Sequence, residues 1–426
     1  MFRGIRRFFK KLGPGVITGA ADDDPSGIAT YTQTGAQFGY GQLWTTIFIL
    51  PLMVSIQEAC ARIGAVTGKG IAKVIKENYS KKLLYFTVFL VVVANTINIG
   101  ADIGAMAEAA NLVLPIGFPL LAIMFTAIVL ILEIFVSYKN YAKILKWLAL
   151  SLLAYPLTLI LISHPWGEII RATFVPHFEF SFSFFFIITG VLGTTISPYM
   201  FFWEASEEVE EEKEKRLTHR NAPPTLTGKF MKNMRTDNFV GMIFTQLATW
   251  AIIVVAGTVL FSAGINNIET AADAAKALEP LVQTFPNAGY LAKLIFATGI
   301  IGLGLLAVPV LSGSASYALS EALNWKEGLN LKLKRAHGFY GIITIATLVG
   351  LAINFIGIDP IKALVFTAVF NGLVAVPLIF IIARVANNKK IMGEWKSSLL
   401  SNVFVWLTFV IMLASSVAMF YSLFNK

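Results

Sequence analysis

The chain has 426 residues, of which 56% are hydrophobic and 14% are charged, with a mean hydropathy of +0.70 and a formal net charge of +9. Because soluble domains carry about 25% charged residues, this composition excludes an ordinary cytosolic enzyme, a nucleic-acid-binding module and a disordered protein, and it predicts a polytopic membrane protein. The one cysteine, Cys60, excludes a disulfide framework and a cysteine-based zinc site.

Eleven apolar runs meet the requirement of roughly 20 helical residues for crossing the hydrocarbon core of a bilayer. In chain order, the predicted spans cover residues 14–34, 42–65, 83–106, 115–137, 143–163, 182–204, 237–263, 288–320, 337–357, 361–384 and 398–422. The predicted fold is therefore an all-α polytopic membrane protein with 11 transmembrane helices.

Lysine and arginine concentrate on one side of this arrangement of spans. If the N-terminus is cytoplasmic, 29 of these residues fall in inside segments and five fall in outside segments. Cytoplasmic loops of membrane proteins carry such an excess of positive charge. We therefore expect a multi-pass protein of the plasma membrane with its N-terminus in the cytoplasm and its C-terminus outside.

Two spans are interrupted by proline together with small and polar residues, at 20–27 in the first span and at 193–199 in the sixth. These spans open two successive groups of five, residues 14–163 and 182–385. Because five is odd, the second group starts from the opposite side of the membrane, as in inverted-repeat transporters, whose site lies at the unwound segments. We expect one transmembrane domain over residues 1–426, with 398–422 as an eleventh helix outside the repeats.

Several stretches of the sequence match the motifs of a known family. They are Gly13-Pro14-Gly15, Asp24-Pro25-Ser26-Gly27, Gly35-Ala36-Gln37-Phe38-Gly39, Ala61-Arg62-Ile63-Gly64-Ala65-Val66-Thr67-Gly68-Lys69 and Met392-Gly393-Glu394. In these stretches, and over most of its length, the chain resembles the Nramp family of divalent-metal transporters. The resemblance implies a LeuT-like 5+5 inverted repeat, with helices 1 and 6 unwound at mid-membrane, that moves manganese, iron and similar ions, usually with protons.

Two motif positions depart from the family pattern. The helix 1 motif usually reads Asp-Pro-Gly-Asn, with Asp and Asn binding the ion, whereas Gly27 stands here in the place of Asn. The helix 6 motif usually reads Met-Pro-His, whereas this chain has Ser197-Pro198-Tyr199. Losing an amide and a thioether leaves a wider, all-oxygen site, which suits magnesium and manganese. These changes resemble the Nramp-related magnesium transporters, a branch that carries magnesium and manganese.

The predicted metal site comprises Asp24, Ala21, Gly27, Thr194 and Ser197. A carboxylate at bilayer depth is costly unless it is paired or hydrated, so we expect Asp24 to bind the ion; the alternative is a cap of the following half-helix, and both roles are compatible. The resemblance implies that Ala21 and Thr194 contribute freed carbonyls. Ser197 contributes a hydroxyl in this hypothesis, and a small packing residue is the alternative.

The predicted ion pathway includes further polar residues of the spans. Because successive helical residues point about 100° apart, Asp22 and Asp23 do not both face the ion of Asp24; one is expected to line the inner pathway and one to cap. Asp102 matches a family aspartate on the proton route, and a packed, hydrogen-bonded acid is the alternative. Asn371 is a pathway candidate that interhelical hydrogen bonding explains equally well.

The end of the sixth span bears on proton coupling. Tyr199 and Glu204 stand where the family usually has histidines, and the four histidines of the chain lie in loops or at helix ends. We expect Glu204 to lie near water in an acidic vestibule, and residues 210–214 to form a solvated helix face. Since a proton relay normally uses groups that titrate near neutral pH, proton coupling is expected to be weak or absent.

The expected function is import of magnesium, manganese or both by alternating access. The alternatives are a proton-coupled manganese or iron transporter of the usual Nramp type and a sodium-coupled amino-acid transporter, in which acids at the helix break would repel the substrate carboxylate. A membrane sensor is disfavoured because the loops are short. An enzyme is disfavoured because the spans contain no nucleophile–base pair. We expect no cofactor beyond the transported Mg²⁺ or Mn²⁺. The expected partners are the divalent ion and the lipid bilayer, and neither nucleic acid nor an obligatory protein partner is expected.

Overall fold

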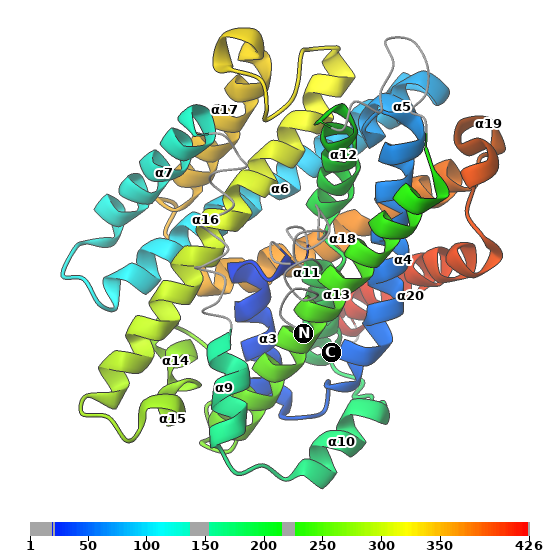
Figure 1. The fold of residues 1–426 in the computed structure, drawn as a ribbon. Helices are drawn as coiled ribbons and strands as arrows, with labels where there is room; N and C mark the ends of the chain where they lie inside the picture. Colours follow the sequence, from blue (N-terminus) through cyan, green and yellow to red (C-terminus); the bar gives the residue numbers. More distant parts are fainter. Residues whose placement is uncertain (1–18, 20–21, 137–152, 215–225, 425–426) are drawn as a thin grey trace, which may run out of the picture.

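The computed structural model describes residues 19, 22–136, 153–214 and 226–424 (Figure 1), and the statements below concern these residues. They form helices and connecting turns without a β-strand, which confirms the all-α class. The longer helices are α3 (Pro25–Phe38), α4 (Trp44–Thr67), α6 (Lys81–Asn111), α7 (Phe118–Phe135), α11 (Phe182–Thr195), α12 (Pro198–Glu214), α13 (Gly228–Ala256), α16 (Ala288–Leu323), α17 (His337–Ile353), α18 (Pro360–Ala386) and α20 (Leu399–Phe424). The shorter ones are α5 (Ile71–Asn78), α9 (Ala154–Leu161), α10 (Trp166–Phe174), η2 (Gly257–Phe261), α14 (Ala271–Lys276), α15 (Glu279–Val282), η3 (Leu333–Arg335), α19 (Lys389–Met392) and η4 (Gly393–Trp395).

Each predicted span contains a helix of the structure. Within the described residues, eight helices are long and apolar enough to cross a membrane, namely α4, α6, α7, α11 with α12, α13 with η2, α16, α18 and α20. The ninth predicted span is the shorter apolar helix α17. Helix α3 occupies the second half of the first predicted span and α9 the end of the fifth; residues 14–18, 20–21 and 143–152 of these two spans lie outside the described residues.

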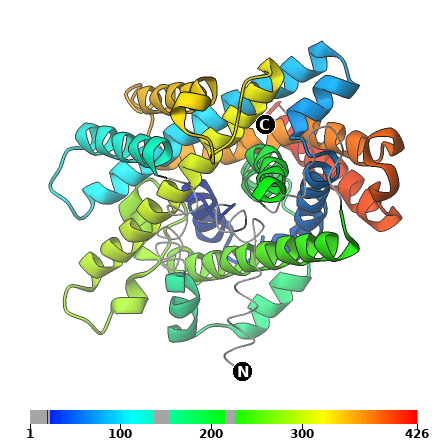
Figure 2. The same cartoon turned by 45° about the horizontal axis from the view of Figure 1, so that its top comes forward.

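The helices divide into a buried centre and a periphery that faces outward. In the α11–α12 pair, 89% of the most apolar window is buried inside the protein, compared with 28% in α7 and 33% in α20. Figure 2 shows α12, in green, near the middle of the helices, with α7 in cyan and α20 in red on opposite sides. The broken sixth span therefore lies at the centre of the molecule, where lipid does not reach it.

Helix α3 starts at the break predicted in the first span. Pro25 is the first helical residue, a position that suits proline because the amide hydrogen it lacks would have no partner there. Asp24 precedes it with an extended backbone (φ −64°, ψ 171°), and its side chain accepts a hydrogen bond from the Gly27 amide. This is the geometry of a helix N-cap, so the Asp24-Pro25 pair starts a new helix.

The second predicted break separates α11 from α12. Ile196 leaves the helical conformation (φ −118°, ψ 62°), and Pro198, which has no amide hydrogen, begins α12. The Ser197 hydroxyl lies 2.8 Å from the Gly193 carbonyl and 2.6 Å from the Thr194 carbonyl and donates to this pair. Ser197 therefore satisfies carbonyls that the interrupted helix leaves without amide partners.

Small residues let α11 and α18 approach closely next to this break. A Cβ added at Gly193 would overlap the backbone of Ala368 and Gly372, and one added at Gly372 would lie 2.6 Å from the Thr189 carbonyl oxygen. Contacts of small residues are typical of packed membrane helices. They hold the end of α11 against a continuous helix, which fixes the position of the broken segment.

The connections contain short helices that the sequence analysis does not predict. Among them, α5 is docked by Glu321 at the end of α16, whose Oε1 accepts from the Gly70 amide at 2.7 Å and whose Oε2 accepts from the Lys73 amide at 3.1 Å. A carboxylate from a distant helix thus replaces a local N-cap. The carboxylate that stabilises α5 therefore lies 251 positions away in the sequence.

Candidate functional site

The start of α3 and the end of α11 meet in the interior of the molecule. Ser26 Oγ lies 3.4 Å from Thr194 Oγ1, and the Tyr31 hydroxyl lies 3.3 Å from Thr195 Oγ1. A Cβ added at Gly27 would lie 3.3 Å from Thr194 Oγ1. The two interrupted spans, predicted from proline and small residues alone, are thus in direct contact at their breaks.

Asp24 is hydrogen-bonded on both carboxylate oxygens and is 1% exposed. Oδ1 accepts from the Gly27 amide at 2.8 Å and from Ser26 Oγ at 2.6 Å, while Oδ2 accepts from Asn98 Nδ2 of α6 at 3.0 Å. A carboxylate offers about four lone-pair positions, and these three bonds place two donors on Oδ1 and one on Oδ2. The capping role considered as the alternative is present, and it leaves Asp24 an oxygen for a ligand.

Helix α6 carries buried oxygen atoms next to Asp24 that accept no hydrogen bond from the described residues. Both Asp102 oxygens and Asn98 Oδ1 are buried and accept no hydrogen bond from any residue that the structure describes. Asn98 and Asp102 are four residues apart, so they share one face of α6, and Asp102 is within electrostatic reach of Asp24. A buried acceptor without a donor is costly, and a bound cation or proton would remove that cost here.

Asp22 and Asp23 contact a different helix. Thr245 Oγ1 of α13 lies 3.2 Å from Asp22 Oδ2 and 2.8 Å from Asp23 Oδ1, and its one proton serves both carboxylates. Both aspartates are buried, and Asp22 Oδ1 has no hydrogen-bond partner within the described ranges. The three consecutive acids therefore divide between α6, which Asp24 contacts, and α13, which Asp22 and Asp23 contact.

The other predicted metal-site residues lie at the end of α11 or outside the described residues. The Ser197 proton is used on the carbonyls of Gly193 and Thr194, so the Ser197 oxygen keeps its lone pairs while the Thr194 carbonyl already accepts a bond. Ala21, whose carbonyl the resemblance implies as a ligand, lies outside the described residues.

Two pathway candidates lie on the helices around the break. Tyr199 is fully buried in the first turn of α12, its carbonyl accepts from Ser314 Oγ of α16 at 2.8 Å, and its phenol interacts electrostatically with Asp24 and Asp102. Asn371 of α18 is 1% exposed, and its Nδ2 donates to no described residue. Asn371 therefore has an amide donor in the core that bonds to no described residue.

The expectations about the acids of α12 are wrong. Glu204 is fully buried rather than near water, with Asn238 Nδ2 of α13 at 3.4 Å from its Oε1. Glu210 and Glu212, expected on a solvated face, are 8% and 0% exposed. The reason is tertiary: the connection between α16 and α17 packs on this end of α12, where Asn330 Nδ2 donates to Glu210 Oε2 at 2.9 Å.

Glu133 is a buried acid that the sequence analysis missed. It lies in α7, is 7% exposed, and accepts a hydrogen bond from Ser312 Oγ of α16 on Oε1, while Oε2 has no partner in the described chain. The signal was available, because an isolated charge inside an apolar span is a functional candidate by default. The Glu133–Ser312 contact shows that α7 contributes polar groups to the interior.

The donor set around Asp24 is mixed. No three His, Cys, Asp or Glu side chains among the described residues come together as a metal-binding group. The groups in contact are the carboxylate of Asp24, the amide of Asn98 and the hydroxyls of Ser26 and Thr194. The carboxylate of Asp102 lies one helical turn from Asn98 on the same face of α6. Such a set of hard oxygen atoms suits an ion that keeps part of its water shell, as magnesium does.

Comparisons with known proteins agree on the family and the fold. The family model "Natural resistance-associated macrophage protein-like" (Nramp) matches residues 15–422. A protein of Caldanaerobacter subterraneus subsp. tengcongensis named divalent metal cation transporter MntH is 24% identical over 409 residues, which cover 94% of this chain and 90% of that protein. A crystal structure of the Eremococcus coleocola manganese transporter superposes with a TM-score of 0.74 at 17% identity, over 97% of this chain and 87% of that one. MhsT in complex with L-phenylalanine superposes with a TM-score of 0.61 at 13% identity, over 96% of this chain and 98% of that one.

Proposed function

The chain belongs to the Nramp family of membrane transporters for divalent metal cations, and from this premise we propose that it imports magnesium, manganese or both across the plasma membrane. The proposed mechanism is alternating access, with proton coupling weak or absent. In this proposal the N-terminus is cytoplasmic and the C-terminus lies outside, because the lysine and arginine residues are distributed in that sense.

The proposal rests on a group of buried oxygen atoms beside the two helix breaks that accept no hydrogen bond from the described residues. Asp102 Oδ1 and Oδ2 and Asn98 Oδ1 are buried without a hydrogen bond to any described residue, and Asp24 Oδ2 accepts from Asn98 beside them. Water would supply donors on a surface, but here the side chains of Asp24, Asn98 and Asp102 are 0–1% exposed. A divalent cation stabilises such a set of oxygens electrostatically, which a neutral or anionic substrate does not.

The preference for magnesium or manganese rests on the ligands at two positions. Gly27 brings no side-chain amide, and Ser197 brings a hydroxyl oxygen in place of a thioether sulfur. Oxygen ligands suit magnesium and manganese, whereas thioethers favour softer ions. Magnesium is usually bound through one or two carboxylates with several waters retained, which agrees with the mixed donor set around Asp24.

Alternating access is supported by how the two interrupted helices are joined. The start of α3 contacts α11 through Ser26 and Thr194 and contacts α6 through Asp24 and Asn98. In inverted-repeat transporters, one bundle moves against the other around a fixed site at such breaks. Helix α3 begins with its own N-cap at Asp24, so it can tilt without pulling apart the backbone hydrogen bonds of α11.

A proton-coupled manganese transporter of the usual Nramp type is the second candidate. Two observations favour it: the relatives reported above are named for divalent metal cation and manganese transport, and Asp102, which matches the family's aspartate on the proton route, is buried with both oxygens unpaired. A carboxyl in that state is as suited to taking up a proton as to stabilising a cation.

The proposal is tested with the purified protein in liposomes under an inside-negative membrane potential. Uptake of Mg²⁺, Mn²⁺, Ca²⁺ and Fe²⁺ is followed with internal indicators, and uptake of radiolabelled L-phenylalanine serves as the control for the amino-acid alternative. We expect uptake of Mg²⁺ and Mn²⁺ and none of L-phenylalanine. Uptake of Mn²⁺ and Fe²⁺ without Mg²⁺ would contradict the ion assignment and favour the second candidate.

A further inference from the structure

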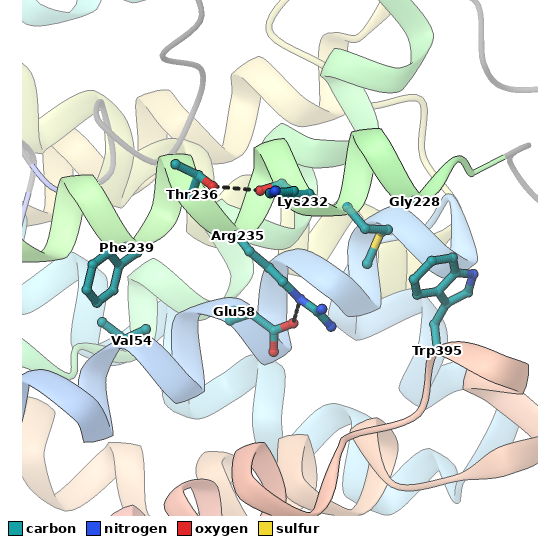
Figure 3. A pocket seen from close by; sticks show the side chains of 9 residues that line it. Val54, Glu58, Gly228, Lys232, Arg235, Thr236, Phe239 and Trp395 are labelled. Atoms are coloured by element: carbon teal, nitrogen blue, oxygen red, sulfur yellow. Dashed lines mark hydrogen bonds and ion pairs between the residues drawn. The ribbon is translucent and has the colours of Figure 1, made fainter. Parts of the chain in front are cut away.

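A furrow runs along α13 where this helix packs beside α4. It consists of three cavities of about 600, 400 and 340 Å³. The first two share Val54, Glu58, Arg235 and Phe239, and the second and third meet at Leu50. Figure 3 shows the first cavity, with Arg235 of α13 reaching toward Glu58 of α4 and with Phe239 beside Val54. The three cavities therefore form one continuous depression.

The character of this furrow changes along its length. Its α13 wall is a helical stripe in which most successive residues are three or four positions apart. In chain order the stripe is Lys232, Arg235, Thr236, Phe239, Ile243, Leu247 and Trp250. The first part is basic and polar, and the part after Phe239 is apolar. From Lys232 to Trp250 the helix rises about 27 Å, so the furrow is polar at one membrane face and apolar through most of the hydrocarbon depth.

The basic end carries an excess of positive charge. Glu58 Oε1 accepts from Arg62 Nε at 3.0 Å and from Arg235 Nε at 2.9 Å, so one carboxylate serves two guanidinium groups. The Arg235 side chain is 52% exposed, and its two terminal amino groups bond to no described residue. Lys232, one turn away on the same stripe, is also exposed. Glu58 holds Arg235 in place and leaves two of its donor groups facing the opening.

The opposite wall of the basic end is held in place by Arg62. Its terminal amino groups donate to the Trp395 carbonyl at 2.7 Å and to Ser397 Oγ at 3.1 Å. Trp395 lines the cavity and is half-buried, and tryptophan is enriched where membrane proteins cross the headgroup region. The wall therefore exists before any ligand arrives, which lowers the entropic cost of binding one.

We propose that this furrow binds an anionic phospholipid, with its phosphate at Arg235 and Lys232 and an acyl chain along Phe239, Leu50 and Leu247. A guanidinium group with two open donors matches a phosphate, and basic pockets between transmembrane helices on the positively charged side of the membrane bind anionic headgroups. Phe239 and Leu247 are 48% and 58% exposed, so their side chains are open to a chain lying along α13. The occupant thus needs a phosphate and an apolar chain in one molecule.

The test is a lipid titration of the full-length protein in detergent, followed by native mass spectrometry. Phosphatidylglycerol and phosphatidylcholine with the same acyl chains are compared. Since each basic side chain near the headgroup region contributes a moderate attraction to anionic lipid, we expect phosphatidylglycerol to bind roughly tenfold to thirtyfold more tightly. The double variant Lys232→Gln/Arg235→Gln is expected to bring the two affinities to within about twofold of each other.

Matched controls separate this site from general charge effects. Lys334→Gln/Arg335→Gln removes the same two charges from an exposed segment outside the furrow and is expected to keep the preference. Thr236→Glu leaves the Glu58–Arg235 pair intact, adds a negative charge to the cavity and is expected to reduce the preference even if the double variant misfolds. An unchanged preference in Thr236→Glu, or displacement of the lipid by millimolar inorganic phosphate, would overturn the proposal.

Discussion

Asp24 shows how one side chain can serve both the fold and the ion. Its Oδ1 caps α3 through the Gly27 amide, while its Oδ2 accepts a bond from Asn98 of α6. From the sequence, helix cap and ion ligand are two roles of this aspartate that are compatible with each other. The structure separates them by atom, because one carboxylate oxygen points along α3 and the other toward α6.

Two substitutions at Asp24 distinguish these roles. Asp24→Asn keeps an acceptor for the Gly27 amide but removes the charge, so we expect a folded protein with divalent-ion uptake reduced at least tenfold. Asp24→Ala also removes the cap, which costs about 0.5–2 kcal/mol of stability, so we expect lost uptake together with a lower melting temperature. Uptake in liposomes and thermal unfolding in detergent are measured for both, and normal uptake by Asp24→Asn would remove Asp24 from the ion site.

The ion preference is tested by restoring the family ligands. Gly27→Asn with Ser197→Met brings back an amide and a thioether, so we expect the Mn²⁺ and Cd²⁺ uptake rates to rise relative to Mg²⁺. A Cβ at Gly27 would lie 3.2 Å from the Tyr31 ring and 3.3 Å from Thr194 Oγ1, so a small shift of these neighbours is required. Gly27→Ala is the control for that steric effect; an ion ranking equal to wild type in the double variant would show that these positions do not face the ion.

At the scale of helices, backbone contacts hold the broken span in place. Gly193→Ala would drive a methyl group into the Ala368 and Gly372 backbone of α18, and such overpacking costs about 1–3 kcal/mol. Gly341→Ala in α17 meets open space, so the better helix propensity of alanine, up to about 1 kcal/mol, leaves the protein as stable as wild type or more so. Thermal unfolding of both variants in detergent measures the difference, and equal melting temperatures would contradict the packing assigned to Gly193.

The connection between α16 and α17 is expected to respond to pH through Glu327. Burial, followed by the nearby Glu321 carboxylate, raises the pKa of Glu327 from 4.5 to about 8, against the opposing effect of Lys213. The folded state then binds more protons than the unfolded state, so this contribution to stability is complete below pH 4.5 and is lost as the pH rises toward 8. We expect Glu327→Gln to flatten the fall in melting temperature between pH 6 and pH 8. The control, Glu394→Gln on an exposed segment, is expected to show the same fall as the wild type. A fall equal to that of the wild type in Glu327→Gln would refute this assignment.

At the scale of the whole molecule, the driving force decides between the two candidate functions. A membrane potential contributes about 2.3 kcal/mol per charge at 100 mV, so a divalent cation gains twice that, enough for roughly a thousandfold accumulation without protons. The structure offers Asp102 as an unpaired acid but places Glu204 away from water, bonded to Asn238. We expect the membrane potential, rather than a proton gradient, to drive uptake.

We accordingly expect Mg²⁺ or Mn²⁺ uptake under an inside-negative potential without matching acidification of the liposome interior. Internal pH and internal metal are followed together, and the potential is collapsed with valinomycin and equal potassium as the control. Acidification that tracks metal uptake and disappears in Asp102→Asn would instead establish the proton-coupled candidate. Loss of all uptake in Asp102→Asn would show that this acid serves the ion itself.

The sequence alone determined the helical class, the position of the spans and the two breaks. Apolar runs of sufficient length must become helices in a bilayer because no water is available there for the backbone. Proline combined with small residues and carboxylates or hydroxyls marks the two breaks, whereas Pro51, Pro309 and Pro377 lie inside continuous helices. Local rules of this kind do not depend on what packs against a segment, which is why the breaks at Asp24-Pro25 and Ser197-Pro198 are found where proline and small residues predict them.

Only the tertiary structure decided which polar groups meet. Asn98 reaches Asp24 across 74 positions of sequence, and Thr245 reaches Asp23 across 222. The exposure of the α12 acids was predicted wrongly because a connection more than 100 residues away covers Glu210. Hydrogen bonding and desolvation depend on neighbours brought together by folding, and the spacing of residues along one chain does not carry that information.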